Sequence, residues 1–499
     1  MKKIILYTSI VLMAWFVPVA CIDDKTTTAF RAGSPIEISV QDTIVYQDFG
    51  LPVVIEPEIT QALPDLPLKY EWRCIATDGS EGSDSLRFIS TEKVLNYKFP
   101  RAGVFRLRLR VENQFGSSFL YFRVNIQAPF EQGLLLLSND EQDNSRISFL
   151  RLKEENELLE KENTDFNLNA FEQANSDVML HGARDVIFTH TGTNSSNYVL
   201  AISSEPEQKI YFLNGRYFLI ENIANVKMLL PEAYPTLLCG NGGGLSQRIM
   251  FGTNDKTGHP GDYGFINLVN ILVFPGEPSG MYDKIISGEF QENSGSIAYI
   301  GCFVDNANSN IICYQRGWYL FTSMKRFVGK QVINGVFVDR DMFLITAEKD
   351  NLRKISIYKS DYNAWNWDEQ EVTFESEPYV YTTDINLTAD CRMVSNEKYQ
   401  YVYYYQENKI YRWVYMASEP KLPTEPELTL DTDDEITCME MSPNREHLWV
   451  CVYNKNADTE LKGKLLVVNP ATMTVEKVFP GISDRAIKVM WKPVQFNER

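Results

Sequence analysis

Side chains that could hold a metal ion or attack a substrate are few in this sequence and far apart. No histidine stands at metal-ligand spacing to another histidine or to a cysteine pair. The four histidines are His181, His190, His259 and His447. The run Gly240–Gly244 lacks the Lys-Ser/Thr ending of a phosphate-binding loop, and no Gly-x-Ser-x-Gly nucleophile elbow occurs. We therefore predict a protein that is not an enzyme and has no metal and no cofactor, although carboxylates from separate strands could still be assembled for glycoside hydrolysis.

The cysteines do not form a convincing disulfide or metal framework. Seven remain besides Cys21, an odd number at wide separations. They are Cys74, Cys239, Cys302, Cys313, Cys391, Cys438 and Cys451. Most of them stand in apolar strand-like runs, so we predict that they are buried as small hydrophobic side chains. Cys438 and Cys451 could face each other across a hairpin, which the sequence does not decide.

Aromatic side chains within polar segments are the best candidates for contacts to a ligand. Two such segments are residues 315–319 and residues 362–370, where tryptophan and tyrosine alternate with Asn, Asp and Gln. Exposed rings beside adaptable hydrogen-bonding groups suit a sugar or a peptide. The candidate ligand-binding residues are Trp318, Tyr319, Tyr362, Trp365 and Trp367. The alternative is that both segments are hairpin tips that pack against the next sheet.

The N-terminus predicts export and lipid attachment. Lys2 and Lys3 precede the apolar run Ile4–Val17, which is too short for a comfortable membrane span, and the small Ala20 stands directly before Cys21. This order is typical of a signal peptide in residues 1–21 with Cys21 as the lipid attachment site. Pro18 departs from the Leu or Val that is usual three positions before such a cysteine, and an ordinary secretory signal is the alternative.

The residues after the cysteine predict where the anchored protein faces. Asp23 and Asp24 resemble the acidic surface-export tag of Bacteroidetes lipoproteins, and residues 22–34 have the polar, aperiodic composition of a tether. We therefore expect a protein of the outer membrane that is held by lipid alone and exposed at the cell surface. The net charge of -18 argues against nucleic-acid partners and against electrostatic docking on anionic lipid.

Residues 35–128 show the alternation of a half-buried antiparallel sheet. Phe105 to Val111 place apolar side chains at every second position, with Arg106, Arg108 and Arg110 between them. The arginines could hold an acidic glycan or a peptide carboxylate, but charged residues on an outer strand face are ordinarily solvated. Upstream, Trp72 is expected to fill the space between two sheets.

These residues carry a family resemblance. The strand around Trp72, followed by the motif from Gly103 to Gly116, resembles the PKD domain, an immunoglobulin-like sandwich. With the lipoprotein signal before it, the chain resembles the PKD-like lipoproteins of Bacteroidetes. The segment Arg73–Ile75 departs from the small polar run that ordinary PKD repeats have after the tryptophan.

Residues 132–495 contain many short strands separated by turn residues, which favours an all-β fold. Residues 434–479 form four consecutive strands, with a Ser-Pro-Asn turn at Ser442 and an Asn-Pro-x-Thr turn at Asn469. Four such strands form one blade of a β-propeller, and blades of about 40 to 45 residues allow eight over this length. Long insertions such as residues 228–262 take up part of it, so we predict seven blades. We also expect the strand Asp484–Trp491 to complete a blade begun near Gly133.

The resemblance implies a role in nutrient uptake. Lipoproteins that look like this one accompany outer-membrane importers of the SusC and SusD kind. It implies a non-catalytic accessory that binds an oligopeptide or a glycan at the propeller mouth or the inter-blade loops and presents it to such an importer. A cell-surface propeller hydrolase or lyase and a structural or adhesive surface protein are the alternatives.

Overall fold

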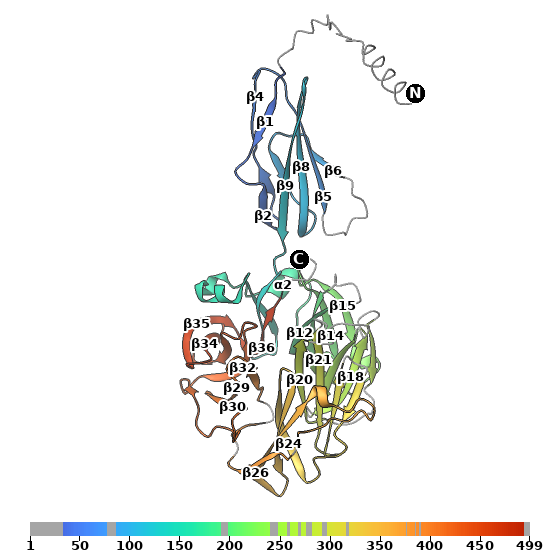
Figure 1. Ribbon diagram of the computed structural model, residues 1–499, viewed down its shortest axis with the longest axis vertical. Helices are drawn as coiled ribbons and strands as arrows, with labels where there is room; N and C mark the ends of the chain where they lie inside the picture. Colours follow the sequence, from blue (N-terminus) through green and yellow to red (C-terminus); the bar gives the residue numbers. More distant parts are fainter. Residues whose placement is uncertain are drawn as a thin grey trace, which may run out of the picture. The chain divides into compact units, whose positions relative to one another are not determined.

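The computed structural model describes residues 33–76, 86–190, 198–239, 248–256, 260–267, 271–275, 282–291, 297–315, 319–375, 377–384, 386–388 and 391–493. The chain is nearly all β and divides into two compact units, Met1–Ile126 and Gln127–Arg499. Figure 1 shows the strands of both units. None of the helices in the described part of the chain has the length and hydropathy needed to cross a membrane.

The first unit contains three sheets. Its strands are β1 (Ile36–Ser39), β2 (Ile44–Asp48), β3 (Val53–Ile55), β4 (Glu58–Gln61), β5 (Lys69–Ala76), β6 (Arg87–Ser90), β7 (Leu95–Tyr97), β8 (Gly103–Asn113) and β9 (Gly116–Gln127). One sheet has the order β2-β9-β8-β5-β6, and the pairs β1-β4 and β3-β7 form the other two. Trp72 is fully buried, 5.6 Å from the ring of Phe122. The alternation predicted along β8 is confirmed, since every second side chain from Gly103 to Asn113 is buried.

The second unit contains seven antiparallel sheets, which we number as blades 1 to 7. Blade 1 contains three strands, β10 (Gly133–Asn139), β11 (Ser145–Arg151) and β36 (Arg485–Lys492). Blades 2 to 4 contain four strands each: in blade 2, β12 (Ala183–His190), β13 (Tyr198–Ser204), β14 (Lys209–Asn214) and β15 (Ile220–Asn225); in blade 3, β16 (Tyr234–Cys239), β17 (Arg248–Asn254), β18 (Pro260–Asn267) and β19 (Leu272–Pro275); in blade 4, β20 (Lys284–Gln291), β21 (Ile297–Asp305), β22 (Asn310–Gln315) and β23 (Tyr319–Thr322). Blades 5 to 7 also contain four strands each: in blade 5, β24 (Lys330–Val338), β25 (Asp341–Glu348), β26 (Asn351–Asp361) and β27 (Tyr379–Thr382); in blade 6, β28 (Val394–Asn396), β29 (Tyr401–Gln406), β30 (Lys409–Val414) and β31 (Leu428–Thr429); in blade 7, β32 (Glu435–Met441), β33 (Leu448–Tyr453), β34 (Gly463–Asn469) and β35 (Thr474–Ser483).

Short helical segments connect some of these strands. They are η1 (Glu155–Glu160), η2 (Asn163–Asp165), α2 (Ala170–Ala174), η3 (Val226–Met228) and η4 (Tyr362–Ala364).

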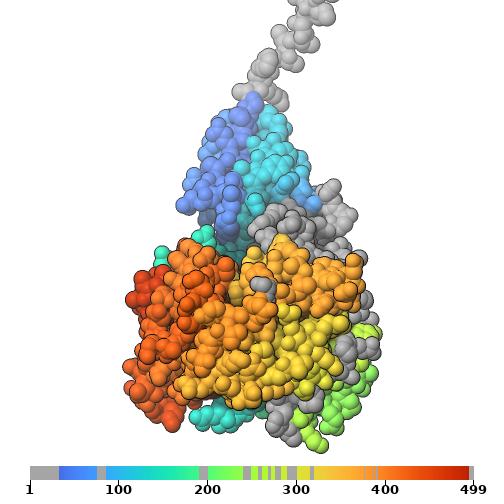
Figure 2. Space-filling model, turned by 60° about the horizontal axis from the view of Figure 1, so that its bottom comes forward, coloured from blue at the N-terminus to red at the C-terminus, as the bar shows by residue number. Residues whose placement is uncertain are grey.

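Contacts between the blades close them into a ring. The innermost strands of neighbouring blades meet in the pairs β12–β16, β20–β24, β24–β28, β28–β32, β32–β36 and β36–β12, while β16 contacts β21 of blade 4. Across the face in Figure 2 the colours pass from yellow through orange to red, so blades that follow one another in sequence are neighbours. The unit is a seven-bladed β-propeller, as the sequence predicted.

The C-terminal strand completes the first blade, which confirms the predicted ring closure. β36 pairs antiparallel with β10, from Gly133 opposite Lys492 to Asn139 opposite Arg485. In the other blades the chain enters at the innermost strand, whereas in blade 1 the innermost strand is the last one of the chain. The start and the end of the propeller are therefore held in one sheet.

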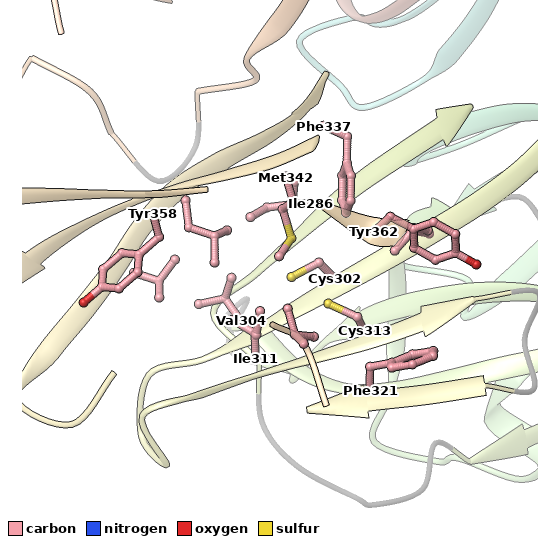
Figure 3. Packing of buried hydrophobic residues seen from close by; sticks show 14 of the residues in the cluster. Ile286, Cys302, Val304, Ile311, Cys313, Phe321, Phe337, Met342, Tyr358 and Tyr362 are labelled. Atoms are coloured by element: carbon pink, nitrogen blue, oxygen red, sulfur yellow. The ribbon is translucent and has the colours of Figure 1, made fainter. Parts of the chain in front are cut away.

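Apolar side chains fill the space between neighbouring blades. Between blades 4 and 5, Cys302 and Cys313 lie side by side among residues of both sheets, including Phe321 and Phe337 (Figure 3). Each blade is apolar on both faces, so each face is covered only by its neighbour. The propeller therefore depends on the complete ring for its core.

Candidate functional site at the centre of the propeller

Five of the innermost strands contain an irregularity at the same place. The pairing of the innermost strand with its neighbour shifts by one residue at Arg184, Thr236, Ile333, Thr437 and Ile487. Such a bulge changes the direction in which the neighbouring side chains point. Asp185 and Lys488 both stand directly after the bulge, in adjacent blades 2 and 1.

Asp185 joins three consecutive blades. Its Oδ1 accepts a hydrogen bond from Lys488 Nζ at 2.5 Å, and its Oδ2 accepts one from the backbone N–H of Leu238 in blade 3 at 2.8 Å. The two side chains are largely buried, with 8 % of Asp185 and 14 % of Lys488 exposed. A buried carboxylate with this cation and two backbone donors, Leu238 and Val186, has its charge compensated.

The opposite side of the ring has a similar set of contacts. Asn334, after the bulge of blade 5 and fully buried, donates from Nδ2 to the carbonyl oxygens of Thr388 at 2.9 Å and Cys391 at 2.8 Å. Lys284, at the start of blade 4, reaches past blade 5 and donates from Nζ to the same Cys391 oxygen at 3.1 Å. The segment that enters blade 6 is thus held by both preceding blades.

Arg392 is the most accessible charge of this region. Its guanidinium forms an ion pair with Glu440 of blade 7 at 2.6 Å, yet 44 % of the arginine side chain remains exposed. The carboxylate of Glu440 raises the pKa of Arg392, and Asp185 of blade 2 adds to this effect against the opposing influence of burial. Arg392 therefore lies within the electrostatic influence of carboxylates from two other blades.

Together these groups form what we call the central polar network. It consists of Asp185, the Leu238 N–H, Lys284, Asn334, Arg392, Glu440 and Lys488, and it receives a group from each of the seven blades. Three cations and two carboxylates meet there. Such an arrangement can bind a ligand that carries charges of both signs through charge-assisted hydrogen bonds.

Sequence reasoning predicted binding at the propeller mouth or the inter-blade loops and did not identify these residues. Asp185 and Lys488 are 303 positions apart, and no motif marks either one. The one shared feature is that each stands two positions after an alanine, Ala183 or Ala486, near the start of an innermost strand, and this becomes visible once the strand register is known.

The aromatic residues predicted to bind a ligand lie elsewhere, near the outer strands of blades 4 and 5. Tyr362 and Trp365 are buried, and Trp365 Nε1 donates to Ser360 Oγ at 2.7 Å. Of the three predicted residues whose side chains the structure describes, Trp367 keeps a large exposed fraction, 44 %, with its ring 4.9 Å from that of Phe321. Their predicted exposure is thus wrong for Tyr362 and Trp365, because both rings pack into the core between the two blades.

The backbone explains why these rings are buried. Thr322, at the end of β23 in blade 4, donates to Gln370 O at 3.0 Å and accepts from Val372 N at 2.9 Å. The segment after β26 of blade 5 therefore pairs with the outer edge of blade 4. Trp318 lies outside the described residues and Tyr319 is placed only by its backbone in β23, so their role as ligand contacts stays a prediction.

The remaining reactive side chains serve packing. His447 is buried and its Nε2 lies 3.3 Å from Glu476 Oε2. Apart from the partly exposed Cys74, the cysteines in the described ranges are buried and form no disulfide, and Cys438 faces Cys451 across β32 and β33. Within these ranges, no three His, Cys, Asp or Glu side chains gather in a way that could hold a metal ion. Cys21, His259 and Gly240–Gly244 lie outside the described residues.

Comparisons with known proteins assign neither a family nor an activity to this chain. The chain matches no family model, and a search of curated proteins finds no relative. A quinonprotein alcohol dehydrogenase-like protein from Bacteroides thetaiotaomicron VPI-5482 is 13% identical, with a TM-score of 0.45 over 91% of this chain and 99% of that one.

Two other solved structures are less similar. AztD from Citrobacter koseri is 10% identical, with a TM-score of 0.37 over 85% of this chain and 98% of that one. A virginiamycin B lyase from Staphylococcus aureus is 11% identical, with a TM-score of 0.33 over 65% of this chain and 93% of that one. The fold assignment rests on the strand pairing described above, and the resemblance to PKD-like lipoproteins stays a prediction from the sequence motif.

Proposed function

We propose that this protein is a lipid-anchored, surface-exposed accessory of the outer membrane that binds an oligopeptide at the central polar network without altering it chemically. It presents the peptide to an importer of the SusC and SusD kind. The observation that carries the proposal is the Arg392–Glu440 pair, a partly exposed ion pair within a network supplied by all seven blades.

The charges of the network favour a peptide over a neutral glycan. A free peptide carries an ammonium group at one end and a carboxylate at the other, and it can exchange partners with an existing ion pair. The ligand carboxylate takes the place of Glu440 at Arg392, and the ligand ammonium takes the place of Arg392 at Glu440. Each charge keeps a partner, so the exchange avoids leaving a desolvated charge unpaired.

The predicted anchor supplies the rest of the role. A lipid on Cys21 and a tether over residues 22–34 would confine the propeller to the membrane surface. Confinement raises the effective concentration of captured peptide next to an importer in the same membrane. This part of the proposal rests on the signal sequence.

A peptide with blocked ends tests the binding site directly. The probes are tetra-alanine with free termini and the same peptide acetylated at its N-terminus and amidated at its C-terminus, measured by isothermal titration calorimetry with the full chain in detergent. We expect the blocked peptide to bind at least about tenfold more weakly, which corresponds to about 1.4 kcal/mol. Equal binding of the two peptides, or binding of neither, contradicts the proposed site.

Variants assign each end of the peptide to a residue. Arg392→Gln should remove the preference for a free C-terminus, and Glu440→Gln the preference for a free N-terminus. Arg353→Gln, which removes an exposed arginine from blade 5, is the matched control and should bind like the unaltered protein. Mass spectrometry of the peptide after incubation should show no cleavage, since a cleaved product would indicate the hydrolase alternative.

A pull-down tests the partner. The protein, tagged at its C-terminus, is recovered from detergent-solubilised outer membranes, and the bound material is identified by mass spectrometry. Recovery of a SusC/SusD-type importer supports the accessory role. Recovery of the protein alone contradicts it and favours a structural or adhesive function.

A further inference from the structure

The outer face of the five-stranded sheet in the first unit combines exposed aromatic rings with arginines. The exposed fractions of its rings are 65 % for Tyr46, 57 % for Phe88, 49 % for Phe119 and 54 % for Tyr121. They lie on β2, β6 and β9, at both sides of the arginine-bearing strand β8. Large rings exposed together on one sheet are unusual for a surface that serves only solubility.

The strand register places these rings and the arginines next to one another. Across β8 and β9, Arg106 faces Arg123, Arg108 faces Tyr121 and Arg110 faces Phe119. Across β5 and β8, Arg73 faces Arg108 and Glu71 faces Arg110. Because directly opposite residues in a sheet share one face, these side chains form a continuous surface over three strands.

Most of these arginines have a carboxylate partner. Arg108 lies 3.2 Å from Glu71, which also pairs with Arg73, and Arg110 lies 2.6 Å from Glu112. Arg108 also stacks over the ring of Phe119 at 5.4 Å. Arg73, Arg108 and Arg110 are therefore explained as ordinary solvated residues of an outer sheet face.

Arg106 and Arg123 differ from the others. They are exposed and directly opposite each other, and neither has an ion-pair partner among the residues that the structure describes. Two like charges in such a pair destabilise a sheet. A local conflict of this kind is expected where the sequence serves binding rather than stability, because an anion placed between the two guanidinium groups would relieve it.

Tyr121 completes the arrangement. It stands two positions before Arg123 on β9, and it is therefore on the same face and diagonal to Arg106. A phenol ring beside two guanidinium groups provides a flat apolar surface next to a bidentate anion clamp. We refer to Arg106, Arg123 and Tyr121 as the arginine clamp.

We propose that the arginine clamp binds an acidic oligosaccharide. A carboxylate or sulfate group lies between Arg106 and Arg123, and the sugar ring that carries it stacks on Tyr121. Phe119 continues the row of exposed rings on β9 toward the next sugar unit. This site is independent of the proposed peptide site, because it lies in the other compact unit and takes a ligand of one charge sign.

The distribution of charge supports a polyanionic ligand at this place. Without the predicted signal peptide, residues 22–126 contain 12 basic and 14 acidic side chains, a net charge of -2, so nearly all of the negative charge belongs to residues 127–499. A polyanion is repelled by the second unit and meets on the first unit a nearly neutral body with a basic face.

Binding of acidic sugar hexamers tests the clamp. The probes are a hexamer of galacturonic acid, the same hexamer fully methyl-esterified, and a sulfated hexasaccharide, measured by calorimetry with the full chain in detergent at low and high salt. We expect at least one acidic probe to bind, to weaken with salt, and to bind at least about tenfold better than the esterified hexamer. Binding of no acidic probe, or equal binding of the ester, overturns the proposal.

Variants locate the site. Arg106→Gln/Arg123→Gln should lower the affinity for the acidic probe by at least about tenfold, and Tyr121→Ser should lower it by several-fold. Arg106→Lys/Arg123→Lys keeps the charges but loses the planar fork, so its affinity should be intermediate. Thermal unfolding of each variant should match that of the unaltered protein.

Two controls separate this site from charge alone and from the central polar network. Lys227→Gln/Arg353→Gln removes two exposed basic residues from the second unit and should leave the affinity unchanged. Arg392→Gln should also leave it unchanged. A loss of binding in either control, with none in the clamp variants, overturns the proposal while leaving the peptide site to its own test.

Discussion

Lys488, on the last strand of the chain, donates to Asp185, on the first strand of blade 2, at 2.5 Å. The same carboxylate accepts the backbone N–H of Leu238 in blade 3 at 2.8 Å. One side chain therefore connects the closing strand with the two blades that follow it in space. The contact stabilises the ring and is also part of the central polar network.

Replacing Asp185 should destabilise the propeller. Asp185→Asn retains an oxygen for the Leu238 N–H but leaves the largely buried Lys488 without a counter-charge, which costs about 3 to 5 kcal/mol. Urea unfolding followed by circular dichroism measures the change. Arg353→Gln is the control, since its exposed pair with Asp384 contributes about 1 kcal/mol or less. Similar losses in the two variants would contradict the role of Asp185.

Removal of the closing strand should abolish cooperative unfolding of the second unit. A chain that ends at Asp484 lacks β36, which exposes β10 and the apolar faces that β36 covers. Limited proteolysis and thermal unfolding should show a loosened second unit. Deletion of residues 494–499 alone, which follow β36, should leave the melting temperature unchanged. A cooperative transition in the shorter chain would show that six four-stranded blades suffice.

Lys492 should make stability depend on pH. Burial lowers the pKa of this lysine to about 7, while Glu131 opposes the effect and Arg216 adds to it. Its unfolded pKa is about 10.4, so between these values the unfolded chain binds a proton that the folded chain lacks. Stability therefore rises with pH above 7, by up to about 1.4 kcal/mol per unit, until tyrosines of the unfolded chain ionise near pH 10.

Unfolding in urea at pH 6.5, 8 and 9.5 measures this rise. Below pH 7 the lysine is charged in both states, so its unfavourable burial persists without further change. Lys492→Met removes the titrating group and should lower the slope of the unfolding free energy against pH by the contribution of about one proton. An equal slope in the variant and the unaltered protein would assign the rise to other groups.

The two tryptophans Trp365 and Trp367 should respond differently to truncation. Trp365→Ala removes a buried ring and its hydrogen bond to Ser360, which costs about 3 to 5 kcal/mol. Trp367→Ala removes a ring that is 44 % exposed and should cost much less. Chemical unfolding gives both values. A larger loss for Trp367 would contradict the burial described above.

The features that could be predicted from the sequence are those that local patterns determine. Alternation along β8 marks a half-buried strand, and turn residues such as Ser442 and Asn469 mark the strand connections of blade 7. The strand near Trp491 closes the ring because every propeller must cover the free edge of its first blade.

The candidate site could not be predicted because it depends on contacts between distant segments. Asp185 and Lys488 meet only after the blades have closed, and a bulge in each strand turns them toward each other. Trp365 and Trp367 have equally polar neighbours in sequence, but pairing of their segment with blade 4 buries one ring and leaves the other exposed.

The pairing of Gly133 with Lys492 closes the propeller into a ring. The fold of the ring therefore does not depend on which of its connections is left open as the chain ends. A circular permutant that links residue 493 to residue 132 and opens the chain at the turn after Met441 would retain all the strand pairs described for blades 1 to 7.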